Sequence, residues 1–173
     1  IMAGSMMNEL RHILPVNRTL LICAAMSGGL LVAAFLFEHV GGLAPCKMCI
    51  WQRWAHVALI LTALSGLLIP TQIRAKPALM CVVVAAMISA AIAGFHAGVE
   101  WQLWDGPSGC TASLNSSGDM SLLVDQLLAT PVVRCDEVPW SLFGISMAGW
   151  NSILSLDIAG FALMSWVANR QAG

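Results

Sequence analysis

The chain has 173 residues, of which 58% are hydrophobic and 10% are charged, and its formal net charge is −1. A soluble globular protein carries about 25% charged residues, so this chain has too few charges to cover a water-exposed surface. Its balanced charge also excludes a basic nucleic-acid-binding surface, and we expect no nucleic acid among its partners. Because the chain is short and apolar throughout, we expect one membrane domain over 1–173.

Four apolar runs have the length of membrane spans or come close to it, since a span needs about 20 mostly apolar residues. Backbone groups in lipid must be satisfied within their own segment, so the runs are expected to be helices. The predicted fold class is therefore all-α, a four-transmembrane-helix bundle. A short loop at 70–77 should make the second and third spans antiparallel neighbours. The spans are expected at about 19–37, 54–69, 78–99 and 147–168.

Residues 1–6, IMAGSM, precede a second methionine and are expected to be a cloning scar. The apolar run after them is too long for a removable signal peptide, and three more runs follow it. We therefore leave residues 1–6 out of the reasoning on the fold.

An even number of spans places both termini on the same side of the membrane. Five basic residues fall on that side and three on the other, so the positive-inside rule predicts cytoplasmic termini. In a bacterial inner membrane, a short loop at about 38–49 and a long one at about 100–146 would then face the periplasm. The basic residues on the two sides are Arg11, Arg18, Arg74, Lys76 and Arg170, against Lys47, Arg53 and Arg134.

The long loop contains one apolar stretch, SLLVDQLLA, at 121–129. On a helix, Leu122, Leu123, Gln126 and Leu127 would lie close together. This piece could lie flat on the bilayer surface or pack on the top of the bundle, and the sequence leaves both arrangements open.

The six cysteines divide into two groups. Cys23 and Cys81 fall inside the first and third spans, where we expect free thiols that behave as small hydrophobic side chains. The other four fall in the outer loops, where an oxidising compartment permits disulfides. These four are Cys46, Cys49, Cys110 and Cys135.

Four outer thiols allow three pairings. Cys46 and Cys49 are close enough to pair, and a tight C-x-x-C bridge is more easily reduced than a structural one. That would leave Cys110 with Cys135. Two structural disulfides are one alternative, but a bridge across three residues hardly constrains the unfolded chain. A zinc site is another, but the spacing is not that of zinc ligands, so redox chemistry is favoured and no metal is expected.

The stretch LAPCKMCIWQR carries both thiols of the first pair and an arginine. If a helix starts at Pro45, then Cys46, Cys49 and Arg53 lie on one narrow stripe at i, i+3 and i+7. The helix N-terminus favours a thiolate there. Arg53 is either a headgroup anchor or a group that polarises the oxygen of a lipid-soluble electron acceptor beside Cys49, for which a quinone is the obvious choice.

Two segments resemble the DsbB family of bacterial inner-membrane proteins. FEHVGGLAPCKMCIWQR is similar to the family's first outer loop, and CDEVPWSLFGISMAGW to the segment after its last cysteine. The early C-x-x-C separates the chain from the vitamin K epoxide reductase group, in which this motif comes late. The resemblance covers most of the chain. It implies a thiol:quinone oxidoreductase that reoxidises a periplasmic, thioredoxin-like DsbA partner and uses ubiquinone or menaquinone.

The resemblance also implies a role for each matching residue. Cys110 and Cys135 would form the disulfide that meets the soluble partner, with Cys110 attacked. Cys135 would then exchange with Cys46, and Cys49 would be the thiolate that touches the quinone. The residues implied to hold the quinone are Arg53, His96, Met147 and Trp150.

Some positions depart from the family pattern. Gln52 stands where a glutamate often precedes the arginine, and the segment around Cys110 differs, which bears on the choice of partner. His56 and Asp157 match no family position; we expect Asp157 to be functional or to bond inward to a residue such as Asn151. The alternatives are a family member dedicated to one special partner, or a non-enzymatic four-span scaffold with structural outer disulfides.

Overall fold

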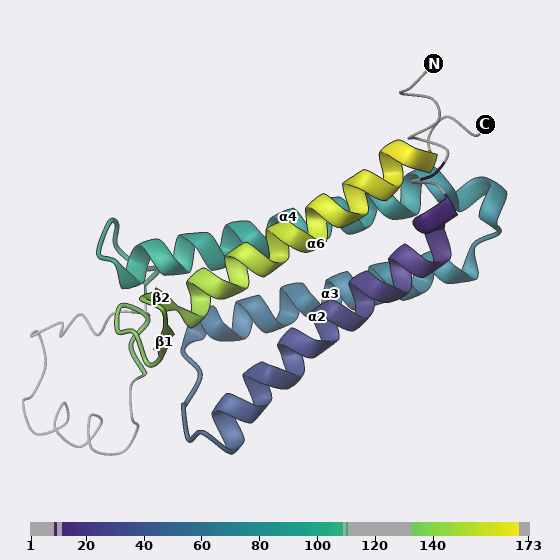
Figure 1. Ribbon diagram of the computed structural model, residues 1–173. Helices are drawn as coiled ribbons and strands as arrows, with labels where there is room; N and C mark the ends of the chain where they lie inside the picture. Colours follow the sequence, from purple (N-terminus) through teal and green to yellow (C-terminus); the bar gives the residue numbers. More distant parts are fainter. Residues whose placement is uncertain (1–8, 10–11, 109, 111–132, 170–173) are drawn as a thin grey trace, which may run out of the picture.

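The computed structural model describes residues 9, 12–108, 110 and 133–169, without the side chains of 71–76. Within these residues, four long helices run antiparallel in chain order, with α3 beside α2 and α4 beside α6 (Figure 1). The start of α2 and the end of α6 lie at one end of the bundle, joined by hydrogen bonds from Ser165 and Asn169 to the Leu14 carbonyl. The helices are α2 (Val16–His39), α3 (Lys47–Leu68), α4 (Thr71–Glu100) and α6 (Met147–Asn169).

The start of α3 is set by a cysteine. Helix α3 begins at Lys47, two residues later than the start predicted at Pro45, and Cys46 is its N-cap residue. The Cys46 sulfur accepts a hydrogen bond from the Cys49 backbone N–H at 3.2 Å. It thus satisfies one of the backbone donors that the first helical turn leaves free. A redox thiol therefore also helps to define the end of the helix.

The connection between α3 and α4 differs from the expected loop at 70–77. Helix α4 already begins at Thr71 and continues through Pro77. A proline inside a helix removes one backbone hydrogen bond, but the helix that follows is long and packs along its neighbours. The loop prediction was therefore wrong, and the link shrinks to Ile69 and Pro70.

Three of the four helices are long and apolar enough to cross a membrane: Val16–His39, Pro77–Glu100 within α4, and Met147–Asn169. Helix α3 falls short because its first half carries Lys47, Arg53 and several uncharged polar residues. Large apolar side chains such as Val32, Leu61 and Val84 are exposed on the outside of the bundle, as expected for a surface in contact with lipid. The predicted all-α membrane bundle is confirmed.

Small residues dominate the buried faces of α4 and α6. Ala86, Ala90 and Ala93 of α4 are buried, as are Ala159 and Ala162 of α6. Small side chains let two helices approach closely within a membrane, where van der Waals packing drives association. These two helices therefore form one tightly packed pair that can support a site at its end.

The two span cysteines differ in burial. Cys23 is fully buried in the core, as expected. Cys81 is exposed on α4, so its predicted burial was wrong. The prediction for Cys81 was based on hydropathy alone. Hydropathy does not distinguish the face of an apolar helix that points into the bundle from the face that contacts lipid.

A short hairpin comes before α6, with strand β1 (Ser141–Leu142) paired antiparallel to β2 (Ile145–Ser146). Its two turn residues have positive φ, 53° at Phe143 and 77° at Gly144. This is the two-residue turn whose twist suits a β-hairpin. The Ser146 hydroxyl then accepts from the Gly149 backbone N–H at 3.1 Å and caps α6. The hairpin therefore leads directly into α6, with no residue between them.

The predicted amphipathic stretch at 121–129 lies outside the described residues.

Candidate functional site

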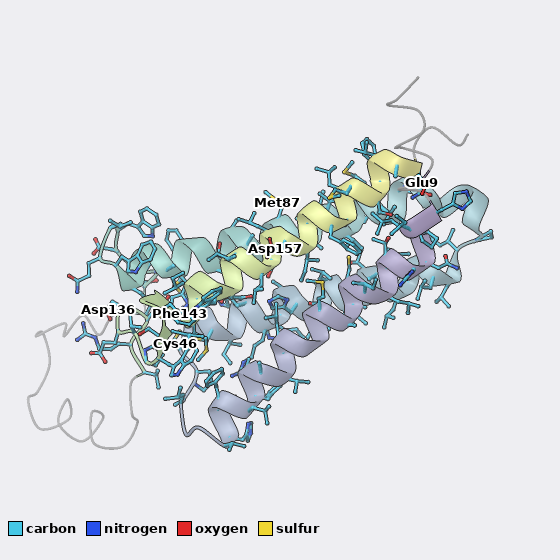
Figure 2. The ribbon with its side chains drawn as sticks, viewed as in Figure 1. Glu9, Cys46, Met87, Asp136, Phe143 and Asp157 are labelled. Carbon is cyan, nitrogen blue, oxygen red and sulfur yellow. The ribbon has the colours of Figure 1, made fainter. Side chains whose placement is uncertain are left out.

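The four outer thiols gather in one buried cluster at the hairpin end of the bundle. Cys46, Cys110 and Cys135 are buried together, and Cys49 packs against them from the first turn of α3. The Cys135 backbone N–H donates to the Cys110 carbonyl at 3.0 Å, which holds the later pair side by side. Figure 2 shows Cys46 and Phe143 of the hairpin at the same end of the molecule.

All six cysteines are free thiols in this structure. The sulfur atoms of Cys46 and Cys49 are 2.7 Å apart, so very little movement separates them from a bond. Cys110 and Cys135 are also hydrogen-bonded through their side chains. The disulfide pairing remains a prediction, although the two thiols of each expected pair are neighbours.

The first pair is electrostatically asymmetric. The hydrogen bond from the Cys46 thiol lowers the pKa of Cys49 and Arg53 adds to this lowering, whereas burial opposes it. The same hydrogen bond, followed by burial, raises the pKa of Cys46. The proton of a singly ionised pair therefore sits on Cys46, and Cys49 is the thiolate. A thiolate is the nucleophilic form of cysteine.

The second pair is poised differently. Burial raises the pKa of Cys110 to about 12, and the hydrogen bond with Cys135 acts in the same direction. A thiol with a raised pKa is a poor nucleophile at neutral pH. Its sulfur can still be attacked when it is part of a disulfide, which is the role that the family resemblance implies.

An apolar cavity of about 430 Å³ lies against the first pair. Its wall comes from α2, the start of α3, the end of α4, the hairpin and the start of α6, so it lies where α2 and α6 diverge (Figure 1). Its size and mostly apolar lining are typical of a site for a small organic molecule. Residues in the wall include Leu30, Ala34, Phe37, Cys49, Gln52, Arg53, His56, His96, Trp140, Met147, Trp150 and Asn151.

All four residues predicted to hold a cofactor are in the wall of this cavity. Met147 and Trp150 come from the first turns of α6, and the Trp150 indole N–H donates to the Leu142 carbonyl at 3.1 Å, which fixes its ring. His96 comes from the last turns of α4 and Arg53 from α3. These four residues are spread over nearly 100 positions of the sequence, and the fold brings them together with Cys49 around one cavity.

Arg53 is held by α2 as well as facing the cavity. Its guanidinium pairs with Glu38, donates to the Ala34 carbonyl at 3.3 Å and lies over the Phe35 ring. Its buried Nε atom has no hydrogen-bond partner in the described part of the chain. An orphaned buried donor is costly unless a ligand satisfies it. This favours an oxygen-bearing ligand over a simple headgroup anchor.

A chain of buried hydrogen bonds in the wall of the cavity was not predicted from the sequence. Gln52 contacts His96 at 2.7 Å, Asn151 donates to Gln52 at 2.6 Å, and His56 contacts Asn151 at 2.7 Å. Gln52 and His56 share the Cys49–Arg53 face of α3, and this spacing was the available signal.

Asp157 takes no part in this chain. Its expected bond to Asn151 was wrong, since Asn151 contacts Gln52 and His56. Asp157 is exposed halfway along α6, away from Cys46 (Figure 2), and has no polar partner among the described residues.

One cluster has the geometry of a metal site. The ligand atoms of Cys46, Cys49 and His96 lie within 4.8 Å of one another. However, Gln52 presents its NH₂ group to His96 Nδ1, so the proton of the neutral ring is on Nε2, the atom that faces the sulfur. For Nε2 to bind a metal ion, the ring proton would have to move to Nδ1, where Gln52 presents a donor, so this arrangement favours redox chemistry.

Comparison with known proteins agrees with this geometry. A family model for disulfide bond formation protein DsbB matches residues 16–165. The disulfide bond formation protein B of Aromatoleum aromaticum is 32% identical over 157 residues, which cover 86% of this chain and 90% of the relative. That of Shewanella frigidimarina is 35% identical over 141 residues, covering 78% and 77%. No solved structure matches the chain significantly.

The matched range contains all four helices up to the last turn of α6 and all four clustered thiols. The resemblance noted in the sequence is thereby confirmed. The chain belongs to the DsbB family, the membrane disulfide oxidoreductases that reoxidise DsbA and pass electrons to quinone.

Proposed function

We propose that this protein takes electrons from a periplasmic, DsbA-like thioredoxin-fold protein and delivers them to ubiquinone or menaquinone in the inner membrane. One observation carries the proposal. Cys49 belongs both to the cluster of four thiols and to the wall of the apolar cavity. A single sulfur atom thus connects the loop chemistry with a site for a lipid-soluble acceptor.

The route begins at the later pair. A thiolate of the partner attacks Cys110, the Cys110–Cys135 bond breaks, and Cys135 leaves as a thiolate. Cys135 then attacks the Cys46 sulfur, the Cys46–Cys49 bond breaks, and Cys49 leaves as the thiolate that its lowered pKa favours. Each step exchanges one disulfide for another, so at this stage electrons pass only between cysteine residues and not yet to the quinone. The shared cluster makes the second exchange a local one.

The cavity suits a quinone head. Its apolar wall matches a ring, the tilted aromatic pair of Phe37 and Trp140 lines it with centroids 4.9 Å apart, and the orphaned Arg53 Nε offers a donor to an oxygen. When bound, a quinone supplies an acceptor for the two electrons and two protons of a dithiol. The protein's own part is to hold Cys49, Arg53 and the ring in place.

The sidedness of the membrane follows from charge. The positive-inside rule applied to the loops and termini puts the ends of α2 and α6 that meet near Leu14 on the cytoplasmic side. The thiol cluster lies at the opposite end of the bundle (Figure 1). It therefore faces the periplasm, where a disulfide donor is maintained in the oxidised state.

The test is a coupled reaction with the protein reconstituted in bilayers. A reduced, DsbA-like thioredoxin-fold protein is added, and its free thiols are titrated while a soluble quinone analogue is followed by its absorbance. Two thiols should disappear for each quinone reduced, because a quinone takes up two electrons, and Cys49→Ser should abolish sustained turnover of both. Thiol loss that continues without quinone, beyond the amount that the protein's own disulfides can oxidise, would contradict the proposal.

The two alternatives give different results in the same assay. A scaffold with structural disulfides consumes no thiols under any condition. A family member dedicated to one special partner reduces quinone with that partner but not with a general DsbA. The alternative of a dedicated family member is based on the sequence around Cys110, which differs from the family pattern. Residues 111–132 lie outside the described residues.

A further inference from the structure

The buried hydrogen-bond chain runs from the centre of the bundle to the redox sulfur. Ser27 lies 2.8 Å from His56 Nδ1, His56 Nε2 lies 2.7 Å from Asn151 Oδ1, and Asn151 Nδ2 donates to Gln52 Oε1 at 2.6 Å. Gln52 Nε2 then lies 2.7 Å from His96 Nδ1, and His96 Nε2 lies 3.5 Å from Cys46 Sγ. Ser27, His56, Gln52 and His96 are all buried.

The two amides give this chain a direction. Amide oxygens only accept hydrogen bonds and amide NH₂ groups only donate. Because Asn151 donates to the Gln52 oxygen, the Gln52 NH₂ group is left to donate to His96 Nδ1. The other end agrees, since the Asn151 oxygen accepts from His56 Nε2. A neutral His96 therefore carries its proton on Nε2.

That proton faces the place where the two cysteine pairs meet. His96 Nε2 is 3.5 Å from Cys46 Sγ, and the Cys135 backbone is also a hydrogen-bond partner of the His96 ring. Cys46 and Cys135 are the two residues that exchange between the pairs in the proposed route. The Cys46 sulfur also accepts from the Cys49 N–H, so it is surrounded by donors.

We propose that Gln52, Asn151 and His56 are positioning residues, which hold the His96 Nε2–H group on the Cys46 sulfur and thereby speed the exchange between the two disulfide pairs. The step concerned follows formation of the Cys46–Cys135 bridge. The partner's second thiolate first displaces Cys110 from the mixed disulfide, so that Cys110 leaves as a thiolate. Cys110 then attacks Cys135, the Cys46–Cys135 bond breaks, and Cys46 leaves as a thiolate that the Nε2–H group stabilises. A hydrogen bond to an ionised partner is stronger than one to a neutral partner.

This inference rests on the proposed function, because it assigns a role within that route. It adds a distinct claim, namely that a set of uncharged side chains away from the thiols controls which nitrogen of His96 is protonated. A merely structural role would be to satisfy buried polar groups. The two roles differ in their effect on the His96 ring, which can be observed directly.

The first measurement is the protonation of His96 in the protein alone. Nitrogen-15 spectra of the full chain in bilayers or detergent should show Nε2–H and a bare Nδ1 for His96. Gln52→Leu removes the amide that donates to His96 Nδ1, and Asn151→Leu removes the donor that orients the Gln52 amide. In both variants His96 should therefore populate both neutral tautomers. An unchanged His96 spectrum in both variants would overturn the inference. Because no partner or quinone is present, this result does not depend on whether the proposed function holds.

The second measurement is the lifetime of the Cys46–Cys135 bridge. Reduced partner is mixed with the oxidised protein, the reaction is quenched with acid and an alkylating agent, and bridged peptides are counted over time. The bridge should resolve about tenfold more slowly in Gln52→Leu and Asn151→Leu, a factor that corresponds to about 1.4 kcal/mol. The attack on Cys110 should stay unchanged. An altered KM for quinone with a normal bridge lifetime would make these residues quinone ligands instead.

Two further variants sharpen the comparison. Gln52→Glu should preserve the bridge lifetime, because a carboxylate accepts from Asn151 and from an Nδ1–H, which leaves a doubly protonated ring still donating through Nε2. Ser152→Ala is the matched control on α6, since Ser152 bonds to the Ala90 carbonyl at 3.0 Å and lies outside the chain. It should leave both the spectrum and the lifetime unchanged. A slow bridge in Ser152→Ala equal to that in Asn151→Leu would show a general packing effect and overturn the inference.

Discussion

The Lys47 side chain reaches from the first turn of α3 to the Ser108 carbonyl, with Nζ 3.0 Å from the oxygen. It ties the segment of the first cysteine pair to the segment that leads to Cys110. Burial is the main influence on the pKa of Cys110 and raises it, whereas the Lys47 charge lowers it. One exposed lysine therefore connects the segments of the two pairs and favours the ionisation of Cys110.

Replacing Lys47 by Met should slow the exchange between the pairs. A hydrogen bond contributes roughly 0.5–1.5 kcal/mol, so the loss should be at most about tenfold. Lys47→Arg should keep most of the rate because it keeps a charged donor. Quenched alkylation with peptide mapping measures the exchange. A Lys47→Met rate equal to that of the original protein would mean that the loops are held together by the buried cluster alone.

Arg53→Ala should reduce quinone-dependent turnover about 10- to 150-fold. The factor corresponds to a charge-assisted hydrogen bond of roughly 1.5–3 kcal/mol. Arg53→Lys should retain part of the activity, because it keeps the charge but loses the planar fork. The first exchange with the soluble partner should survive, so the variant should stall with reduced thiols. Normal turnover in Arg53→Ala would reduce Arg53 to a headgroup anchor.

The ion pair with Glu38 calls for its own control. Arg53→Ala also removes the partner of Glu38, and an unpaired, partly buried carboxylate is itself destabilising. Glu38→Gln keeps Arg53 and removes only the negative charge. If Arg53 acts on the acceptor, Glu38→Gln should retain turnover within a few-fold, whereas thermal stability should fall similarly in both variants. A turnover loss in Glu38→Gln equal to that in Arg53→Ala would assign the effect to the ion pair.

The asymmetry of the first pair predicts the order of alkylation. In the fully reduced protein, iodoacetamide should modify Cys49 before Cys46, since only thiolates react. Because the pKa of Cys49 is lowered, its reactivity should persist as the pH falls below the range of an ordinary thiol, and should be lost once the pH passes below the Cys49 pKa. Arg53→Ala should move that midpoint to higher pH. Preferential modification of Cys46 would reverse the assignment.

The oxidised protein should contain Cys46–Cys49 and Cys110–Cys135 bridges, with Cys23 and Cys81 free. The thiols of each expected pair are neighbours in one cluster, whereas Cys23 lies in the core and Cys81 on the outer face of α4. Peptide mapping after alkylation without reduction checks this. A bridge to Cys23 or Cys81 would contradict it, but a trapped Cys46–Cys135 bridge is an intermediate of the proposed route.

Topology can be read from reporter fusions. Fusions at Lys76 and at the C-terminus should report the cytoplasm, and one near Ser117 the periplasm, because of the distribution of Arg and Lys over an even number of spans. A periplasmic signal at Lys76 would place the thiol cluster in a reducing compartment. The proposed disulfide chemistry could not operate there.

The hydropathy of the sequence predicted the bundle, because the length of each apolar segment is a local property of the sequence and the thickness of the bilayer sets the length that a span needs. The grouping of Cys49 and Arg53 was also accessible, since residues four apart share a helical face. Helix α3 shows the limit of hydropathy. The first half of α3 carries the polar residues of the site, so its mean hydropathy is too low for a predicted span. It is nevertheless an integral helix of the bundle.

Other features depended on contacts between distant segments. Gln52 and Asn151 are 99 residues apart, and no local period could show that their amides meet. The hairpin strands have two residues each, too short for any alternation, and a phenylalanine at positive φ is unusual in a turn. Asp157 was expected to point inward because charges in lipid are costly, and the structure places it outside nevertheless.

Because Cys49 is the sulfur shared by the cavity and the thiol cluster, the two substrates of the reaction approach from different phases. The soluble protein arrives through water at the loops, and the quinone arrives through the lipid. In the proposed route neither has to be present while the other reacts, since the oxidising equivalent is stored in the predicted disulfides of the protein between the two reactions. Steady-state rates measured at several fixed quinone concentrations should therefore give parallel double-reciprocal lines, the pattern of a ping-pong enzyme.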